Sequence, residues 1–264
     1  MSAPSSVYGP VHSWRVGRSL GVDLLLVNSV CSFRCVYCQL GRINVHTSGR
    51  KVYVPTARVL RDLRASRWRE ADIITLSGSG EPTLAANVGE VIGEIKRLTG
   101  KPVLVLTNAT TLGEAEVRRD LDAADKVFCK LDAACEETFR AINRPAEGIT
   151  LRSVVEGIKA FRAEYSGRLG VQIMLMRINR EQADRLAPLL NEIGPDEVQL
   201  NAPLRRIPRR WFVGARGDHA QAPPSAVRPK IIGKEVAAAF EARLRDLTGL
   251  KIIAADCYRQ GLQE

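Results

Sequence analysis

Residues 72–107 read DIITLSGSGEPTLAANVGEVIGEIKRLTGKPVLVLT, and this stretch decides the fold class of the chain. Two apolar runs, residues 72–77 and 102–107, flank a segment at 87–98 whose apolar positions recur at helical spacing. A strand, a helix and a second strand in this order form a unit in which the two strands lie parallel. Their central residues, IITL and VLVL, are apolar on both faces, as is typical of strands covered by helices on one side and by a packed interior on the other.

The same alternation of strand and helix patterns extends from about residue 22 to residue 201. Six runs are predicted as strands, at 23–27, 72–77, 102–107, 126–131, 170–177 and 197–200. The helical segments between them include 56–69, 87–98, 151–163 and 181–192. After residue 201 only a helix at 233–247 and a short apolar run at 251–254 remain, too little for the last two units of a closed barrel. We therefore expect an α/β fold, a partial (βα)6 TIM-type barrel with a C-terminal extension.

The chain of 264 residues suits one domain, with a core at about 20–201 and an extension at 202–264. Residues 201–230 interrupt the alternation with five prolines and seven basic residues against one acidic residue. This composition predicts a long, irregular basic loop, and loops of such length inside compact domains are usually functional or disordered.

The charge balance favours polyanionic partners, because 39 Lys and Arg against 29 Asp and Glu give a formal net charge of +10. A basic but merely solvated surface is an equally weighted alternative. No apolar run approaches the ~18–20 residues of a membrane span, and the N-terminus has no secretory pattern. We expect a cytoplasmic protein without a membrane partner, in which cysteines are metal ligands or buried thiols rather than disulfides.

Three of the six cysteines form a compact array directly after the first predicted strand. Residues 28–41 read NSVCSFRCVYCQLG and place Cys31, Cys35 and Cys38 in a C-x3-C-x2-C spacing. Cysteine thiolates bind iron–sulfur clusters, and three of them leave one iron of a [4Fe–4S] cluster open. A zinc site usually has four ligands in paired C-x2–4-C elements, and no second C-x2-C exists in the chain. The spacing therefore predicts a [4Fe–4S] cluster.

This array, with Tyr37 immediately before its last cysteine, resembles the radical S-adenosylmethionine (SAM) superfamily over about residues 8–201. The resemblance implies that the open iron chelates the amino and carboxylate groups of SAM. It also implies reductive cleavage of SAM to a 5′-deoxyadenosyl radical, with an electron donor of the ferredoxin or flavodoxin type. Tyr37 is then implied to lie near the adenine.

A second segment carries the resemblance further. The sequence LSGSGEPTL at 76–84 is similar to the GGE motif of the family, which binds the methionine amino group; its counterparts here are Gly78, Ser79, Gly80 and Glu81. The segment follows a predicted strand one βα unit after the cysteines, and barrel sites lie at the carboxyl ends of strands.

Later strand ends supply the remaining candidates for SAM binding. The resemblance implies ribose and carboxylate contacts from such positions, here Asn108, Lys130 and Asp132. An interior salt bridge, or a helix cap by Asp132, is the structural alternative. Gln172, on the fifth predicted strand, is a further candidate.

The stretch 130–145, KLDAACEETFRAINRP, together with LSGSGEPTL and TNAT, resembles the subgroup that contains demethylwyosine synthase, an enzyme of tRNA modification. The chain departs from that enzyme, since no cysteine precedes Cys31 and Cys38 is followed by QLG, as in a sister group with a YCQLG motif. The resemblance implies tRNA or another RNA as substrate. Modification of a protein or peptide, such as activation of a glycyl-radical enzyme, is the alternative.

The other three cysteines are Cys129, Cys135 and Cys257. They could ligate an auxiliary cluster, or they could be inert thiols or include one functional thiol. Their wide spacing does not bring them together in one compact loop, which favours inert thiols or one functional thiol over a cluster.

Overall fold

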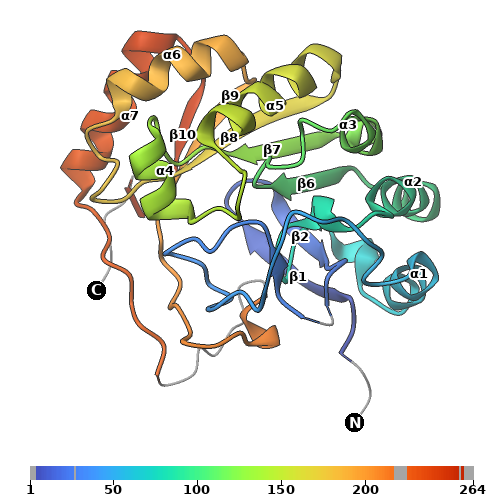
Figure 1. Cartoon of the computed structure of the whole chain (residues 1–264). Helices are drawn as coiled ribbons and strands as arrows, with labels where there is room; N and C mark the ends of the chain where they lie inside the picture. The colour runs from blue at the N-terminus through green and yellow to red at the C-terminus, as the bar shows by residue number, and fades with distance from the viewer. Residues whose placement is uncertain (1–3, 27, 217–224, 256, 259–264) are drawn as a thin grey trace.

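A computed structural model of the chain describes residues 4–26, 28–216, 225–255 and 257–258. These residues form one curled sheet of eight strands in the order β1-β2-β5-β6-β7-β8-β9-β10 (Figure 1). The strands are β1 (Val7–Ser13), β2 (Gly17–Val22), β5 (Ile73–Leu76), β6 (Val103–Thr107), β7 (Lys126–Lys130), β8 (Arg168–Met174), β9 (Glu197–Asn201) and β10 (Ile252–Ala254). Neighbours from β2 to β10 are parallel, and β1 is antiparallel to β2. The expected α/β fold with a partial barrel is confirmed.

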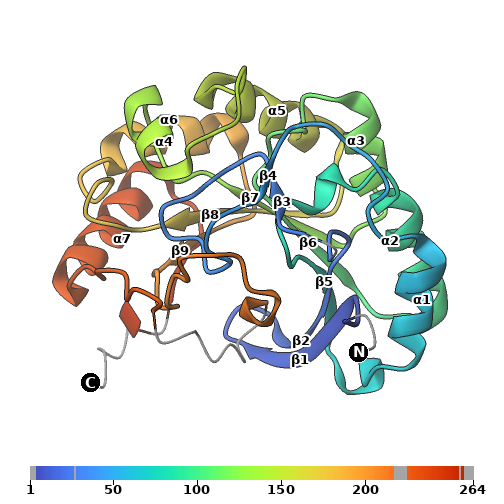
Figure 2. The ribbon, with the colours of Figure 1, turned by 60° about the horizontal axis from the view of Figure 1, so that its bottom comes forward.

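The helices lie on the outer side of this sheet. They are α1 (Thr56–Arg64), α2 (Val88–Thr99), α3 (Ala115–Leu121), α4 (Glu136–Asn143), α5 (Leu151–Glu164), α6 (Ala183–Ile193) and α7 (Lys234–Thr248). Short 3-10 turns are η1 (Trp68–Glu70), η2 (Pro82–Leu84) and η3 (Val213–Ala215). Figure 2 shows the helices as an arc around the sheet, while the loop after β2 and the segment after β9 lie on its inner side.

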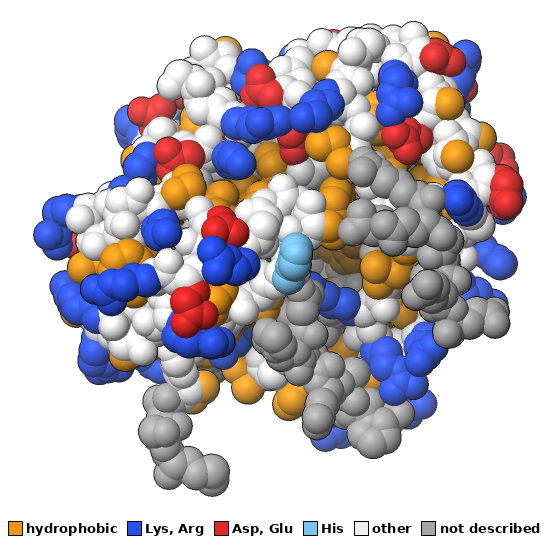
Figure 3. All heavy atoms as spheres, turned by 180° about the vertical axis from the view of Figure 1, so that it is seen from behind, with side chains coloured by type: hydrophobic (Ala, Val, Ile, Leu, Met, Phe, Trp, Pro, Cys, Tyr) orange, Lys and Arg blue, Asp and Glu red, His pale blue; other side chains and the backbone are white. Residues whose placement is uncertain are grey.

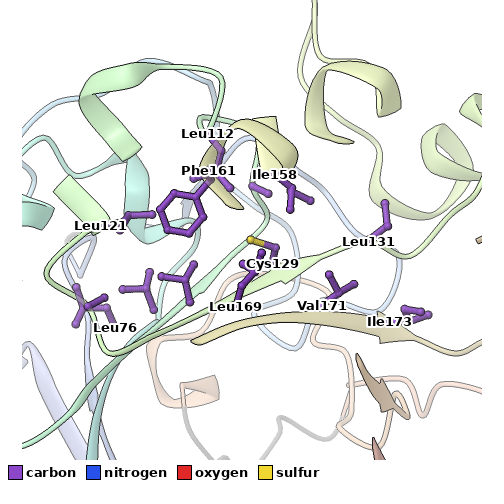
Figure 4. Close-up of a cluster of buried hydrophobic side chains, with 14 of the residues drawn as sticks. Leu76, Leu112, Leu121, Cys129, Leu131, Ile158, Phe161, Leu169, Val171 and Ile173 are labelled. Carbon is purple, nitrogen blue, oxygen red and sulfur yellow. The ribbon is translucent and has the colours of Figure 1, made fainter. Parts of the chain in front are cut away.

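Alternation along each strand separates two environments. On β7, Val127 and Cys129 belong to the main hydrophobic core between sheet and helices, whereas Phe128 packs in a separate cluster on the inner face. Figure 4 shows the core side, where Cys129 lies among residues such as Phe161 and Leu169. The inner face therefore carries this smaller apolar cluster, together with polar side chains and a cavity.

The first predicted strand, 23–27, is wrong. The strand in this position is β2, Gly17–Val22, and it pairs with β1 in an N-terminal hairpin that the sequence patterns did not reveal. Leu24, Leu25 and Leu26 are buried in a turn, where Asp23 accepts a hydrogen bond from the Leu25 N–H at 2.9 Å. A short apolar run shows no periodicity, so the sequence pattern alone does not distinguish a strand from a buried turn. Val27 lies outside the described residues.

The remaining differences lie at the ends of the sheet. The apolar run at 251–254 forms β10, which extends the sheet beyond β9. Between β9 and α7 the chain is irregular, as expected, and residues 217–224 of this segment lie outside the described part. In the described ranges, every helix is too short or too polar to cross a bilayer.

Candidate active site

The three cysteines lie in the loop between β2 and α1. Cys31 ends the short strand β3 (Val30–Cys31), which pairs with β4 (Val45–His46). Cys35 and Cys38 share a turn in which the Cys38 N–H donates to the Cys35 carbonyl at 3.1 Å. Burial raises the pKa of all three thiols, that of Cys35 to about 12, and the neighbouring cysteines add to the rise at Cys31 and Cys35. The thiols thus lie near one another in a water-poor place.

The glycine-rich segment after β5 holds the start of this loop. The Val30 N–H donates to the Ser79 carbonyl at 2.9 Å, and the Glu81 N–H donates to the Val30 carbonyl at 3.0 Å. Gly80 has a φ of +151°, and a Cβ built on it would lie 1.7 Å from the Val30 oxygen. Only glycine permits this approach, which fixes Cys31 relative to the sheet.

The Glu81 side chain is buried among the ends of β5 and β6. Its carboxylate accepts from the Asn108 N–H at 2.6 Å and from the hydroxyls of Thr83 and Thr107, both at 2.7 Å. Burial raises the pKa of this carboxyl, and the hydrogen bonds lower it. Glu81 therefore ties the end of β5 to the end of β6.

Asn108, at the end of β6, reaches the cysteine loop. Its Nδ2 donates to Ser32 Oγ at 2.8 Å and lies 3.6 Å from Cys31 Sγ. The Oδ1 atom accepts from Thr110, so the orientation of the amide is set on both sides. Asn108 thus presents an N–H to a sulfur.

Asp132 forms a second connection between strand end and cysteine loop. Its buried carboxylate accepts from the Tyr37 hydroxyl, from Asn143 Nδ2 at 2.8 Å and from the Met174 N–H at 2.7 Å. Asn143 Nδ2 also lies 3.5 Å from Cys35 Sγ. Burial, followed by the nearby Asp132 charge, raises the pKa of Tyr37.

The structural alternatives considered for Asp132 are absent from the described part of the chain. The residue that caps α4 is Cys135, and no ion pair within 4.0 Å joins Asp132 to Lys130. The Lys130 ammonium instead lies 5.3 Å from the centre of the Tyr37 ring. Lys130 therefore lies beside the aromatic residue of the cysteine array.

A cavity of about 440 Å³ occupies the inner side of the sheet, a volume within the usual range of ligand pockets. Its lining near the cysteine loop comprises Tyr37, Cys38, Gly78, Gly80 and Lys130. The opposite wall is formed by the β1–β2 hairpin, with Tyr8, His12, Trp14 and Arg15, and by residues 202–205. None of the described lining residues is an Asp or a Glu.

The segment 202–216 closes one side of the site through the residues that follow Cys38. Gln39 Nε2 donates to the Ala215 carbonyl at 3.0 Å, and Arg205 donates to Gln39 Oε1. Gly41 has a φ of +76°, and a Cβ on it would lie 2.5 Å from the Pro208 oxygen. Gln39 and Gly41 of the QLG sequence therefore hold residues 202–216, called the basic segment below, against the cysteine loop.

The same segment is attached at its other end by a buried ion pair. Arg216 donates to Asp23 Oδ2 at 3.2 Å, and the side chains of Arg216 and Asp23 are only 10% and 1% exposed. Ser79 Oγ donates to the same carboxylate at 2.6 Å. Asp23 thus joins the basic segment to the glycine-rich segment.

Comparison with known proteins identifies the family. Residues 25–190 match the model of the Radical SAM superfamily, and this range contains the cysteine loop, the glycine-rich segment and the ends of β6 and β7. The chain belongs to the radical SAM superfamily.

Two curated relatives of this radical SAM protein are UPF0026 proteins. The one from Synechocystis is 49% identical over 83% of this chain and 83% of the relative. The one from Methanocaldococcus jannaschii is 34% identical over 75% of this chain and 63% of the relative. This chain thus spans less than two thirds of the archaeal relative.

Solved structures share the fold. Streptococcus suis SuiB bound to S-adenosylmethionine has a TM-score of 0.62 and 13% identity, over 86% of this chain and 48% of that one. Archaeal TYW1 has a TM-score of 0.58 and 14% identity, over 89% and 74% of the two chains. At these identities the likeness is one of fold, and the wyosine reaction does not follow from it.

The donor set of this radical SAM protein fits its family's cofactors, a [4Fe–4S] cluster and SAM. The three thiols are half-buried and have raised pKa values, and bound iron would stabilise them as thiolates. In the described part of the chain, no three His, Cys, Asp or Glu side chains converge on a single-ion site. A cube binds each cysteine to a different iron, so its ligands need not meet at one point. The cavity lined by Cys38 gives SAM a place beside them.

The structure divides the predicted SAM residues into two groups. Tyr37, Gly78, Gly80 and Lys130 line the cavity. Ser79, Glu81, Asn108 and Asp132 are buried, with side chains bonded to protein groups. Gln172 is also buried and donates to Gln199 Oε1 at 2.9 Å, beside Lys130 in the sheet register.

Sequence reasoning missed Asn143, although it lies in the distinctive 130–145 stretch. Its position became visible only when α4 placed it against Cys35 and Asp132. Among the other cysteines, Cys129 packs in the outer core, Cys135 caps α4, and Cys257 lies against the core beyond β10. Cys129 is buried, whereas Cys135 is partly exposed and its hydrogen bonds with Thr138 lower the pKa of its thiol.

Proposed function

We propose that this radical SAM protein modifies RNA, with transfer RNA as the expected class of substrate. The observation that carries the proposal is the lining of the cavity. It offers the cationic side chains of Arg15, Lys130 and Arg205 and the aromatic side chains of Tyr8 and Trp14, with no carboxylate among the described lining residues. Phosphates are bound by Lys and Arg, and unstacked bases pack on aromatic rings.

The charge of the whole chain supports the same substrate class. The formal net charge is +10. Figure 3 shows Lys and Arg side chains spread over the face seen from behind, with fewer Asp and Glu side chains between them. Such a surface attracts a polyanion by long-range electrostatics but does not read its sequence. The target base would be selected by contacts inside the cavity.

The roles proposed for the chain's own residues follow from their places. Cys31, Cys35 and Cys38 would hold the cluster, and Tyr37, Gly78, Gly80 and Lys130 would contact SAM. Asn108, Asp132 and Glu81 would position these groups, with Ser79 and Gln172 supporting them.

Held by Cys31, Cys35 and Cys38, a reduced cluster would supply the electron for reductive cleavage of SAM, and the bound pair would thereby supply hydrogen-atom abstraction from the substrate. We place the enzyme in the cytoplasm, whose reducing conditions keep its thiols available for iron.

The test is anaerobic reconstitution followed by incubation with dithionite, SAM and bulk tRNA from cells that lack this protein. A nucleoside whose mass changes only with active enzyme would support the proposal. Trp14→Ala should reduce the change, while Trp68→Ala, on η1 outside the cavity, should not. Deoxyadenosine formation without any altered nucleoside in any RNA fraction would contradict the RNA substrate.

The alternative, radical modification of a protein or peptide, is tested in the same mixture. Candidate proteins replace tRNA, and a glycyl radical is sought by electron paramagnetic resonance. Binding over a salt series separates the two, because an RNA enzyme loses affinity for RNA steeply as salt rises.

A further inference from the structure

A second hollow, of about 440 Å³, lies beside the cysteine loop and shares no lining residue with the SAM cavity. It is lined by Arg34, Arg42, Asn44, Arg210 and Trp211, and is called the arginine pocket below. Arg34 lies between two cluster cysteines, and Arg42 follows the third by four residues. The cysteine loop therefore contributes to both cavities.

The arginine pocket carries positive charge that no described carboxylate neutralises. In the part of the chain that the structure describes, no carboxylate lies within 4.0 Å of Arg34, Arg42 or Arg210. Two donors on its lining residues, Arg34 Nε and Trp211 Nε1, are shielded from solvent and have no acceptor among the described residues. Buried donors of this kind normally find an acceptor, and the positive charge of the three arginines favours an anionic one.

Trp211 connects the pocket to the cluster ligands. Its side chain packs on the small hydrophobic group of Leu40, Ile43 and Ala215, which Cys31 and Cys38 also contact. A partner seated in the arginine pocket would thus lie one side-chain layer from two of the three ligands.

We propose that the arginine pocket is the docking site of an acidic, low-potential electron-transfer protein. The donor passes one electron to the oxidised cluster and is itself oxidised by one electron. Three arginines without a carboxylate partner among the described residues suit a partner with clustered Asp and Glu, and charge complementarity speeds such encounters. The SAM cavity stays free, since the two cavities share no lining residue. The proposal rests on the radical SAM activity, and not on the RNA substrate.

The test compares two ways of reducing the reconstituted enzyme. Absorbance of the cluster is followed in stopped flow after mixing with a reduced flavodoxin or, separately, with excess dithionite, and no substrate is needed. Arg42→Glu with Arg210→Glu reverses the charge of the pocket on two exposed residues. Arg119→Glu with Arg152→Glu, exposed on α3 and α5, makes the same change of net charge elsewhere.

At low salt the pocket variant should be reduced by flavodoxin about tenfold or more slowly than wild type, with dithionite rates unchanged. The control variant should lose much less, and added salt should slow the wild type but hardly the pocket variant.

Equal losses in both variants, or an unchanged flavodoxin rate, would overturn the proposal. So would a pocket variant that binds tRNA poorly yet accepts electrons normally, because the pocket would then belong to the nucleic acid. A failed search for altered nucleosides leaves the cluster-reduction result intact, so the two proposals fail separately.

Discussion

Gly80→Ala tests the idea that the glycine-rich segment fixes the cysteine loop. The new methyl group would overlap the Val30 carbonyl, 1.7 Å away, and would break the hydrogen bonds that Val30 makes with Ser79 and Glu81. Each hydrogen bond contributes about 1 kcal/mol, and a non-glycine residue at such a φ costs about 1–3 kcal/mol. We expect the free energy of unfolding to fall by about 3–5 kcal/mol.

Gly100→Ala is the matched control. Gly100 also has a positive φ, +62°, at the end of α2, but a Cβ there would meet no atom within 4 Å. Its backbone strain alone should cost about 1–2 kcal/mol.

The assay is urea unfolding of the cluster-free chains, together with iron content after anaerobic reconstitution. Gly80→Ala should also retain less iron, since Cys31 directly follows Val30, whereas Gly100→Ala should load normally. If Gly80→Ala were no less stable than Gly100→Ala and loaded iron equally well, the close approach would not be what holds the loop.

Three further predictions concern side chains that hold parts of the chain together through hydrogen bonds or an ion pair. Asn143→Leu removes the N–H near Cys35 Sγ. Losing about 1 kcal/mol of hydrogen bonding to the reduced cluster should lower the midpoint potential of the cluster by about 40 mV in an EPR-monitored titration. Asn191→Leu on α6 is the control and should leave the potential unchanged. Arg216→Ala leaves the buried Asp23 carboxylate without its cation, so we expect a loss of about 3 kcal/mol in urea unfolding and faster proteolysis of residues 202–216, partly restored by adding Asp23→Asn. Burial raises the pKa of Asp62, but hydrogen bonds from Ser6 outweigh it and bring the pKa below its usual value. The ionised carboxylate therefore stabilises the folded chain above the unfolded-state pKa, and this stabilisation is lost as the pH falls through the folded-state pKa. The acid side of a stability–pH profile should be flatter in Asp62→Asn. An equally steep profile in that variant would contradict this origin.

The fold class was predictable because its signals are local. The alternation of apolar runs with helical spacing recurs over short windows, and five of the six predicted strands correspond to β5, β6, β7, β8 and β9. The first strand was placed wrongly, since a buried turn such as Leu24–Leu26 is as apolar as a strand.

The site was predictable to the extent that its residues share a motif. Cys31, Cys35 and Cys38 stand within eight positions, and the glycine-rich segment follows one βα unit later. The division of labour among the other residues was not predictable. Glu81 and Asp132 look like cofactor contacts in the sequence, yet their carboxylates are occupied by protein donors.

The sequence alone determined the family, the cysteine array and the parallel order of the strands, because each depends on spacing along the chain. Only the tertiary structure decided which residues contact the basic segment and the cluster cysteines. Gln39 and Gly41 contact the basic segment, and Asn143 reaches Cys35. Arg34, Arg42 and Arg210 line one pocket. These contacts join residues about 100 to 180 positions apart. Such pairs leave no periodic pattern, since it is the curl of the sheet that brings them together.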